Sequence, residues 1–140
     1  MSDFELDSRL AANSVLVDQG PLSQVRLMND ERFPWLVLVP RVTGITEWLE
    51  LDGNQQDQLR TELNRCCRAL KGTDGVEKIN FATLGNIVPQ LHFHVVGRHV
   101  GDPAWPAPVW GHGQAHPFDA AVLQERVAMW KERLGYSPQP

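Results

Sequence analysis

Five short apolar runs along the chain have the pattern of β-strands. Glycine, proline or clusters of polar residues bound each run, and the residues inside are β-branched or bulky. A Gly-containing loop joins the last two runs, where apolar and polar positions alternate, so we expect these two to pair as antiparallel strands. The expected strands cover residues 15–17, 25–29, 35–39, 76–81 and 91–96.

Three other segments carry apolar residues at the spacing of an amphipathic helix. They cover about residues 3–12, residues 52–72 and about residues 119–134. Each begins at a side chain that can cap a helix: Ser2 with Glu5, Asp52 with Gln55, and Asp119. The middle segment is the longest, which predicts one long central helix plus N- and C-terminal helices.

The order of these elements favours an α+β fold. No alternating strand and helix rhythm points to a parallel sheet. We expect an antiparallel meander of about five strands around the central helix, in a single domain over residues 1–140. Residues 102–117 contain four prolines, which resist both helix and ladder, so we expect a loop there. Its Trp105 and Trp110 can pack over the domain, stack on a nucleobase or dock on a partner subunit.

Charge and cysteine content exclude several function classes. Thirteen basic against seventeen acidic residues give a formal charge of −4, so no basic surface is expected to bind a nucleic acid duplex. Cys66 and Cys67 are neighbours, which rarely allows a disulfide, and we expect reduced thiols.

Because the N-terminus lacks a signal-peptide pattern and the longest apolar run is short, we expect a cytoplasmic protein without membrane contact.

The chemically informative stretch runs from residue 89 to residue 98. Alternate side chains of a strand share a face, so Gln90, His92 and His94 project to one side. Neighbours on one face lie about 6.6 Å apart, which lets two imidazoles reach different oxygens of one phosphate. A neutral imidazole is a nucleophile and a protonated neighbour supplies charge or a proton. The pair therefore predicts nucleophilic chemistry on a phosphate.

Other interpretations stay open from the spacing alone. The two histidines can face solvent or be hydrogen-bonded within the core. They can also bind a metal ion if His99, His112 or His116 completes the ligand set, although no cysteine pair completes a structural site. Arg41 and Arg98 can contact a phosphate, or they can be solvated charges.

The sequence resembles the histidine-triad (HIT) family of nucleotide hydrolases and transferases, whose signature is His-φ-His-φ-His-φ-φ, with φ an apolar residue. Here the stretch reads Gln90-Leu-His92-Phe-His94-Val-Val. The resemblance extends upstream through Leu27-Met-Asn29 and covers most of residues 4–100. Residues 102–111 look like those of a bacterial branch of small single-domain HIT proteins. The resemblance implies a HIT-like fold.

The resemblance also implies catalytic roles for both histidines. His92 matches the middle histidine, which attacks the α-phosphorus and is transiently nucleotidylated. His94 matches the third, which contacts the phosphate and stabilises the developing charge. In another register His94 would be the nucleophile and Val96 would take the third position, which fits the signature worse.

Nucleotide-binding positions follow from the same resemblance. Asn29 matches a residue that hydrogen-bonds a ribose hydroxyl, and Leu27 matches a wall of the base pocket. Asn80 matches a side chain that contacts sugar or phosphate. The loop that approaches the phosphate matches Gly85, Asn86, Ile87 and Val88, with Asn86 as its polar side chain.

Gln90 is where the chain departs from the family, which has its first histidine there. That position is supportive rather than nucleophilic, and a carboxamide still donates and accepts hydrogen bonds. The resemblance therefore still implies an active enzyme and keeps Gln90 in the binding site. We expect Gln90→His to add a titrating group beside His92 and to move the acidic limb of the pH profile to lower pH.

The function implied is hydrolysis or nucleotidyl transfer at the α-phosphate of a nucleoside phosphate derivative, such as a dinucleoside polyphosphate or a nucleoside phosphoramidate. No tightly bound cofactor is expected, and any Mg²⁺ arrives with the nucleotide. HIT proteins of this size commonly pair, which implies a homodimer with residues near 59–70 at the interface. The alternatives are a nucleotide-binding or sensing module without turnover and a His-ligated metal-binding protein.

Overall fold

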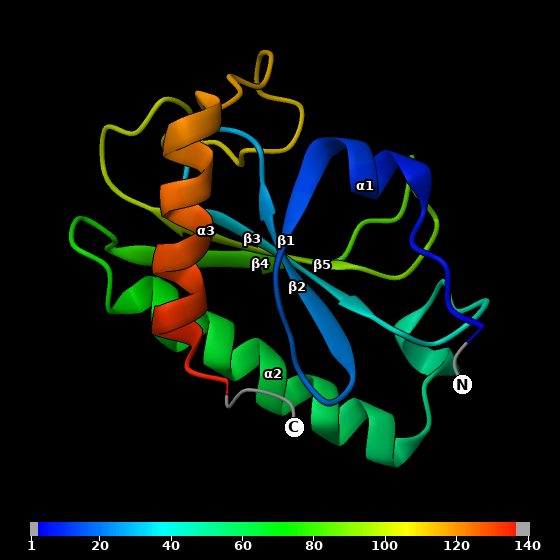
Figure 1. Cartoon of the computed structure of the whole chain (residues 1–140). Coiled ribbons are helices and arrows are strands. Elements are labelled where there is room, and N and C mark those ends of the chain that lie inside the picture. The colour runs from blue at the N-terminus through cyan, green and yellow to red at the C-terminus, as the bar shows by residue number, and fades with distance from the viewer. Residues whose placement is uncertain (1–2, 137–140) are drawn as a thin grey trace.

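The computed structural model describes residues 3–136, which form a five-stranded antiparallel sheet with three α-helices and one short 3₁₀ helix (Figure 1). The strands are β1 (Ser14–Gln19), β2 (Ser23–Met28), β3 (Trp35–Pro40), β4 (Lys78–Ala82) and β5 (Phe93–Arg98). The helices are α1 (Ser8–Asn13), α2 (Gly53–Lys71), α3 (Ala120–Leu134) and the 3₁₀ helix η1 (Trp48–Glu50). Each strand falls on an expected apolar run, and the α+β class is confirmed.

The strand order in the sheet is β1-β2-β3-β5-β4, and neighbouring strands are antiparallel. The first three strands form a meander. The chain then passes through α2 to the outer edge, where β4 lies, and β5 returns between β3 and β4. In this arrangement His94 pairs with Val37 on one side and with Ala82 on the other. The histidine strand is therefore held by backbone bonds along both edges.

Different parts of the chain cover the two faces of the sheet (Figure 1). The helices α2 and α3 pack on one face, over a core that includes Val95. The opposite face carries a second core, which includes Leu10 of α1 and Val109 of the loop over residues 102–117. Trp35 and Trp110 belong to this second side and contact the ring of His94. The histidines therefore project away from the two long helices.

The expected caps of α2 and α3 are confirmed. The Asp52 side chain accepts a bond from the backbone N–H of Gln55, and the Gln55 side chain accepts from the backbone of Asp52. Gly72 ends α2, and Asp119 caps α3. Local sequence signals therefore fix the ends of both helices. None of the helices within residues 3–136 combines the length and the apolar character needed to cross a membrane.

The N-terminal helix begins later than expected. The prediction for residues 3–12 is wrong at its start, because the helix is capped by Asp7. The Asp7 side chain accepts from the backbone N–H of Arg9, which is a local capping signal. The backbone N–H of Asp7 and the carbonyl of Glu5 bond to the side chain of Gln90 and do not continue the helix. Ser2, the expected cap, lies outside the described residues.

Candidate active site

His92 and His94 lie side by side on the second face of the sheet. His94 belongs to β5 and His92 directly precedes that strand, and the ring centroids are 4.9 Å apart. Both residues are buried, with 5% and 7% of their surface exposed. A solvent-facing pair is thereby excluded. The two imidazoles lie close enough together to act on one small group.

A hydrogen bond fixes the protonation of His92 at one ring nitrogen. Its Nδ1 lies 2.7 Å from the carbonyl oxygen of Gln90. A carbonyl oxygen only accepts hydrogen bonds, so Nδ1 carries the proton. In the neutral ring Nε2 then keeps its lone pair. A free lone pair on nitrogen is what nucleophilic attack requires.

His94 is enclosed by two indole rings. The rings of Trp35 and Trp110 meet it edge to face, each with its centroid 5.6 Å from the imidazole centroid. Trp35 Nε1 donates a hydrogen bond of 3.0 Å to His94 Nδ1. Burial, assisted by the nearby His92, lowers the pKa of His94 to about 3. His94 is therefore neutral at pH 7, and the expected protonated neighbour of the nucleophile does not fit these surroundings.

The two histidines line a cavity of about 340 Å³. One side of this histidine cavity is the loop over residues 84–88, which contains the expected Gly85, Asn86, Ile87 and Val88. Gly85 has a φ of 71°, a left-handed conformation that glycine adopts without strain. Trp35 and Trp110 form another side. The structure thus brings the histidines and this loop together, as the sequence suggests.

A second cavity, of about 330 Å³, adjoins the histidine cavity and contains Asn29 in its wall. Met28, Trp35 and Gly111 line both cavities. The side-chain oxygen of Asn29 accepts a bond of 2.9 Å from the backbone N–H of Phe118. This bond fixes the orientation of the amide at the wall of the second cavity.

Two expected nucleotide-binding residues lie apart from the histidine cavity. Leu27, the expected wall of the base pocket, is buried in the core on the opposite face of the sheet and lines neither the histidine cavity nor the cavity that contains Asn29. The reason is the alternation of β2, which places Met28 rather than Leu27 beside the histidines. Asn80 lies on β4, where its side-chain oxygen accepts a bond from Arg98 instead of lining the cavity.

The Gln90 side chain extends to the N-terminal segment. Its Oε1 accepts from the backbone N–H of Asp7 and its Nε2 donates to the carbonyl of Glu5, both at 2.8 Å. Arg9 adds a bond of 2.9 Å to the carbonyl of Ile87. The start of the chain is therefore fastened beside the histidines, and Gln90 does not line the cavity.

This geometry is at odds with the expectation for Gln90→His. A histidine in place of Gln90 would face backbone atoms of the N-terminal segment, so a titrating group directed at His92 has no structural basis. Strand alternation sets the face from which a side chain starts, but it does not set the direction in which a long side chain extends.

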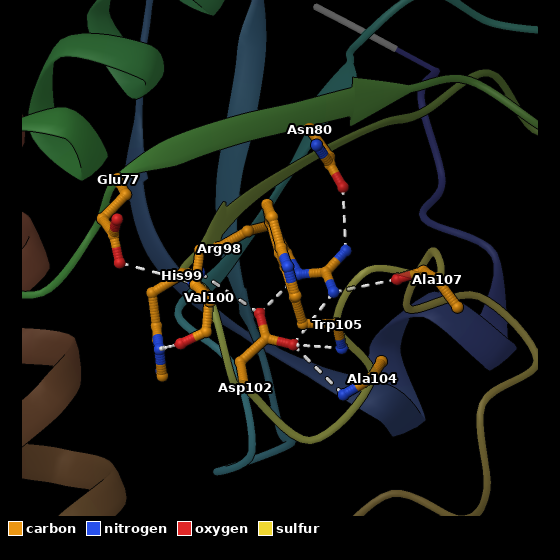
Figure 2. A network of polar contacts seen from close by, with 9 residues as sticks. All are labelled: Glu77, Asn80, Arg98, His99, Val100, Asp102, Ala104, Trp105 and Ala107. Carbon is orange, nitrogen blue, oxygen red and sulfur yellow. Dashed lines mark hydrogen bonds and ion pairs between the residues drawn. The ribbon is translucent and has the colours of Figure 1, made fainter.

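Arg98 is buried in a polar network on the same face of the sheet (Figure 2). It is 1% exposed, and it donates to both carboxylate oxygens of Asp102, at 2.7 and 2.9 Å. A third bond of 2.9 Å goes to Asn80, and the rings of Phe33 and Trp105 each lie 5.6 Å from the guanidinium carbon. The expectations of a phosphate contact or a solvated charge are therefore both wrong for Arg98.

Asp102 connects this network to the proline-rich loop (Figure 2). Its carboxylate accepts the backbone N–H groups of Ala104 and Trp105, and Arg98 donates to the carbonyl of Ala107. The Arg98 guanidinium lowers the pKa of Asp102 to about 2. The start of the loop is thus fixed to β5, and Trp110, further along it, forms part of the cavity wall.

The described part of the chain, residues 3–136, holds no group of three or more His, Cys, Asp or Glu side chains that could bind a metal ion. His112 and His116 are exposed on the proline-rich loop, and the metal interpretation has no ligand cluster there. Cys66 and Cys67 are both free, and burial raises the pKa of the Cys66 thiol to about 12. Neither feature supplies a second reactive centre.

The HIT domain family matches residues 9–101, which include both histidines and all five strands. The chain belongs to the histidine-triad family. Solved structures of three bacterial proteins are similar to this HIT protein over 94% of its length. No match was found among curated proteins.

The three similar structures are all of histidine-triad proteins. The protein from Sinorhizobium meliloti is 45% identical, with 97% of that chain covered and a TM-score of 0.90. The one from Bradyrhizobium japonicum is 43% identical, with 98% covered and a TM-score of 0.89. The one from Marinobacter aquaeolei is 42% identical, with 96% covered and a TM-score of 0.90. Membership of the HIT family supports nucleotide binding and hydrolase or transferase chemistry in general terms.

Two residues that shape this HIT site carry no motif of their own. Met28 and Trp35 sit in apolar runs, where the sequence shows only that they are apolar. Alternation of β3 places Trp35 on one face with Val37, but the contact with His94 follows only once β3 and β5 are known to be neighbours. The strand order is therefore the missing information.

Proposed function

We propose that this HIT protein acts in the cytoplasm as a hydrolase or nucleotidyl transferase, attacking the α-phosphate of a nucleoside phosphate derivative with His92. The observation that carries the proposal is the hydrogen bond from His92 Nδ1 to the carbonyl of Gln90, which directs the proton of the neutral ring to Nδ1 and the lone pair to Nε2, in a ring that lines the cavity. HIT family membership supports a nucleotide as the substrate. The free cysteines are consistent with a reducing compartment.

The chemistry proceeds in two displacements at phosphorus. Nε2 of His92 forms a bond to the α-phosphorus while the bond from phosphorus to the leaving group breaks, and the leaving group takes up a proton from water or substrate. Water then forms a bond to the phosphorus of the nucleotidyl-imidazole and passes a proton to solvent, while the P–N bond breaks and the neutral ring of His92 returns. An alcohol or amine in place of water makes the same enzyme a transferase. Neutral His94 donates a hydrogen bond to a phosphoryl oxygen in both steps.

The two adjoining cavities suit the two parts of a nucleotide. We place the phosphate in the histidine cavity, against Gly85 and Asn86, and the nucleoside in the second cavity, where Asn29 can meet a ribose hydroxyl. The shared wall of Met28 and Trp35 lies between the two positions. Any Mg²⁺ enters with the phosphates of the substrate, because Mg²⁺ keeps several waters and needs few protein ligands.

A panel of adenine and guanine conjugates tests the proposal. Dinucleoside polyphosphates and nucleoside phosphoramidates are incubated with the protein, and the products are identified by chromatography and mass spectrometry. We expect release of a nucleoside monophosphate, and a quenched reaction in which the intact protein gains the mass of one nucleotidyl group. Tight binding of these ligands without any product contradicts the proposal and identifies a nucleotide-binding or sensing module instead.

We also propose that the protein forms a homodimer through α2 and the edge strand β4. Phe81 on β4 is 60% exposed, and it lines an apolar surface hollow of about 340 Å³ together with Leu63 and Cys67 of α2. An edge strand leaves backbone groups available for pairing, and an exposed aromatic beside it favours contact with a partner. Light scattering should give twice the monomer mass, and Phe81→Asp should return it to the monomer value.

A further inference from the structure

We infer that Trp35 is a positioning residue of this HIT site, whose indole N–H holds His94 in the neutral tautomer with the proton on Nε2. The tautomer is a property of the free protein. Its consequence for catalysis rests on the proposed function.

The tautomer follows from the chemistry of the two partners. Indole Nε1 carries one N–H and has no acceptor lone pair, so it can only donate. It lies 3.0 Å from His94 Nδ1, which must therefore accept the bond and carry no proton. In the neutral ring, the proton then sits on Nε2. Both residues are buried, so water cannot readily replace the indole as the partner.

Trp35 is itself held in place. It begins β3 and pairs with Val96 of β5, the second residue after His94. Its ring packs edge to face against Phe33 and Trp110, with centroids 6.3 and 6.4 Å away. The donor is therefore part of the packed second core and does not depend on a mobile side chain.

The groups around His94 offer no support for a charged ring. Among the residues that line the histidine cavity, His92 is the other titratable side chain. The strand β2 contributes Met28 and the proline-rich loop contributes Trp110. The loop over residues 84–88 contributes the amide of Asn86 and apolar residues, none of them charged. Asp7 and Arg9 do not line the cavity; they pair with each other at 2.9 Å, and Arg9 donates to the carbonyl of Ile87. A protonated His94 would thus have a fellow imidazole as its nearest titratable neighbour.

The two histidines consequently present opposite functions at the same atom. In the neutral ring, His92 donates a hydrogen bond from Nδ1 to a carbonyl and keeps a lone pair at Nε2, whereas His94 accepts a hydrogen bond at Nδ1 and keeps an N–H at Nε2. One ring is prepared to attack phosphorus and the other to donate to a phosphoryl oxygen. The opposite tautomer of His94 would direct a lone pair at that oxygen, which is repulsive.

The wild-type protein alone provides the first test. Long-range ¹H–¹⁵N NMR spectra of the protein labelled with ¹⁵N-histidine, recorded without any nucleotide, identify which ring nitrogen of His94 is protonated; His94→Gln assigns the signals. We expect a proton on Nε2 and a bare Nδ1 from pH 8 down to pH 5. A proton on Nδ1, or titration of His94 within that range, overturns the inference.

Trp35→Phe and Trp110→Phe form a matched pair for the second test. Both indoles touch His94 at the same centroid distance, but only Trp35 Nε1 donates to it; Trp110 Nε1 has no hydrogen-bond partner among the described residues. Trp35→Phe should produce a mixture of tautomers and raise the titration midpoint of His94 by about one unit or more, because a bond to the neutral ring is lost. Trp110→Phe should keep the wild-type tautomer. Equal spectra for the two variants contradict the inference.

Kinetics separate this inference from the proposed function. On a substrate that the wild type cleaves, Trp35→Phe should lower kcat about 10-fold with a smaller change in KM, because the donor acts mainly on the transition state. An unchanged kcat in a variant with a shifted tautomer contradicts the positioning role. A protein that cleaves no nucleotide but shows the Nε2 tautomer fails only the proposed function.

Discussion

Nδ1 of His92 lies 2.7 Å from the carbonyl oxygen of Gln90, two residues earlier in the chain. The bond is local, so it forms as soon as the segment entering β5 takes its shape. The bond does not depend on which side chain stands at position 90, because the acceptor is a backbone atom. The nucleophilic role proposed for His92 is therefore compatible with Gln90 in the first triad position.

His92→Ala should abolish turnover and leave the fold intact. The variant removes the atom that bonds to phosphorus, so we expect kcat to fall by at least about 10³-fold. The intact-mass signal of the nucleotidyl-enzyme should vanish with it. His99→Ala, at an exposed position that lines neither cavity, serves as the control and should behave as wild type. Near wild-type hydrolysis by purified His92→Ala would show that another residue attacks.

Gln90→Leu should loosen the N-terminal segment. The change removes both bonds to Glu5 and Asp7, which we expect to cost about 1–2 kcal/mol of the free energy of unfolding. Hydrogen exchange measured by mass spectrometry should be faster over residues 5–9 than in wild type. The matched control is Gln124→Leu, at an exposed position of α3.

Gln90→His should follow Gln90→Leu in hydrogen exchange, because its ring faces the same backbone atoms. We expect the acidic limb of its pH profile to stay at the wild-type position. If the acidic limb of the pH profile moves while hydrogen exchange over residues 5–9 stays at the wild-type rate, the side chain at position 90 faces His92.

Asp102→Asn should destabilise the protein far more than the same change at an exposed ion pair. It removes the carboxylate that pairs with fully buried Arg98, and an unpaired buried charge costs about 3–5 kcal/mol. Asp57→Asn is the control, since its partner Arg60 is 3.8 Å away on the surface of α2, and we expect a change below about 0.5 kcal/mol. Urea unfolding measures both. Similar losses for the two variants would show that the buried pair contributes no more than the exposed one.

The stability of the protein should fall between pH 7 and pH 5 because of His94. Its pKa of about 3 in the folded state lies below the ordinary histidine value of 6.5, so the unfolded chain binds the proton first. The free energy of unfolding should therefore drop by about 2 kcal/mol over this range from this residue. Asp102, whose pKa is about 2, loses its contribution only below the ordinary carboxyl value of 3.8 and so does not interfere.

His94→Gln isolates this contribution. Glutamine does not titrate, and its side-chain oxygen can accept the Trp35 N–H, so the drop from pH 7 to pH 5 should shrink by about 2 kcal/mol relative to wild type. His112→Gln, exposed on the proline-rich loop, should retain the wild-type slope. Equal slopes for wild type and His94→Gln would show that His94 titrates normally in the folded protein.

Features of the fold that depend on residues close together in the sequence could be predicted, and features that depend on distant residues could not. The ends of α2 and α3 depend on side chains within three residues of the helix start, so Asp52 and Asp119 could be recognised as caps. The strands and the histidine face follow from local alternation. The start of α1 was misplaced because two local caps compete: Asp7 caps the helix, and Gln90, more than 80 residues away, holds the segment just before it out of the helix.

The parts of the site that were not predicted depend on strand order and on burial. Trp35 meets His94 because β3 neighbours β5, and no local pattern encodes that pairing. Arg98 carries a charge, and charged residues are rarely buried. Its burial depends on the ion pair with Asp102, four residues later, and on the rings of Phe33 and Trp105, which pack against the guanidinium. The family resemblance alone assigned Leu27 to the base pocket, whereas the structure buries it in the core under α2 and α3.

The Arg98 network protects the start of the loop over residues 102–117 from local opening, although this segment has no regular secondary structure. The amides of Ala104 and Trp105 donate to Asp102, which is tied to the interior strand β5, so these protons can exchange with solvent only when the centre of the sheet opens. The Trp110 side of the histidine cavity therefore behaves as a fixed wall rather than as a lid.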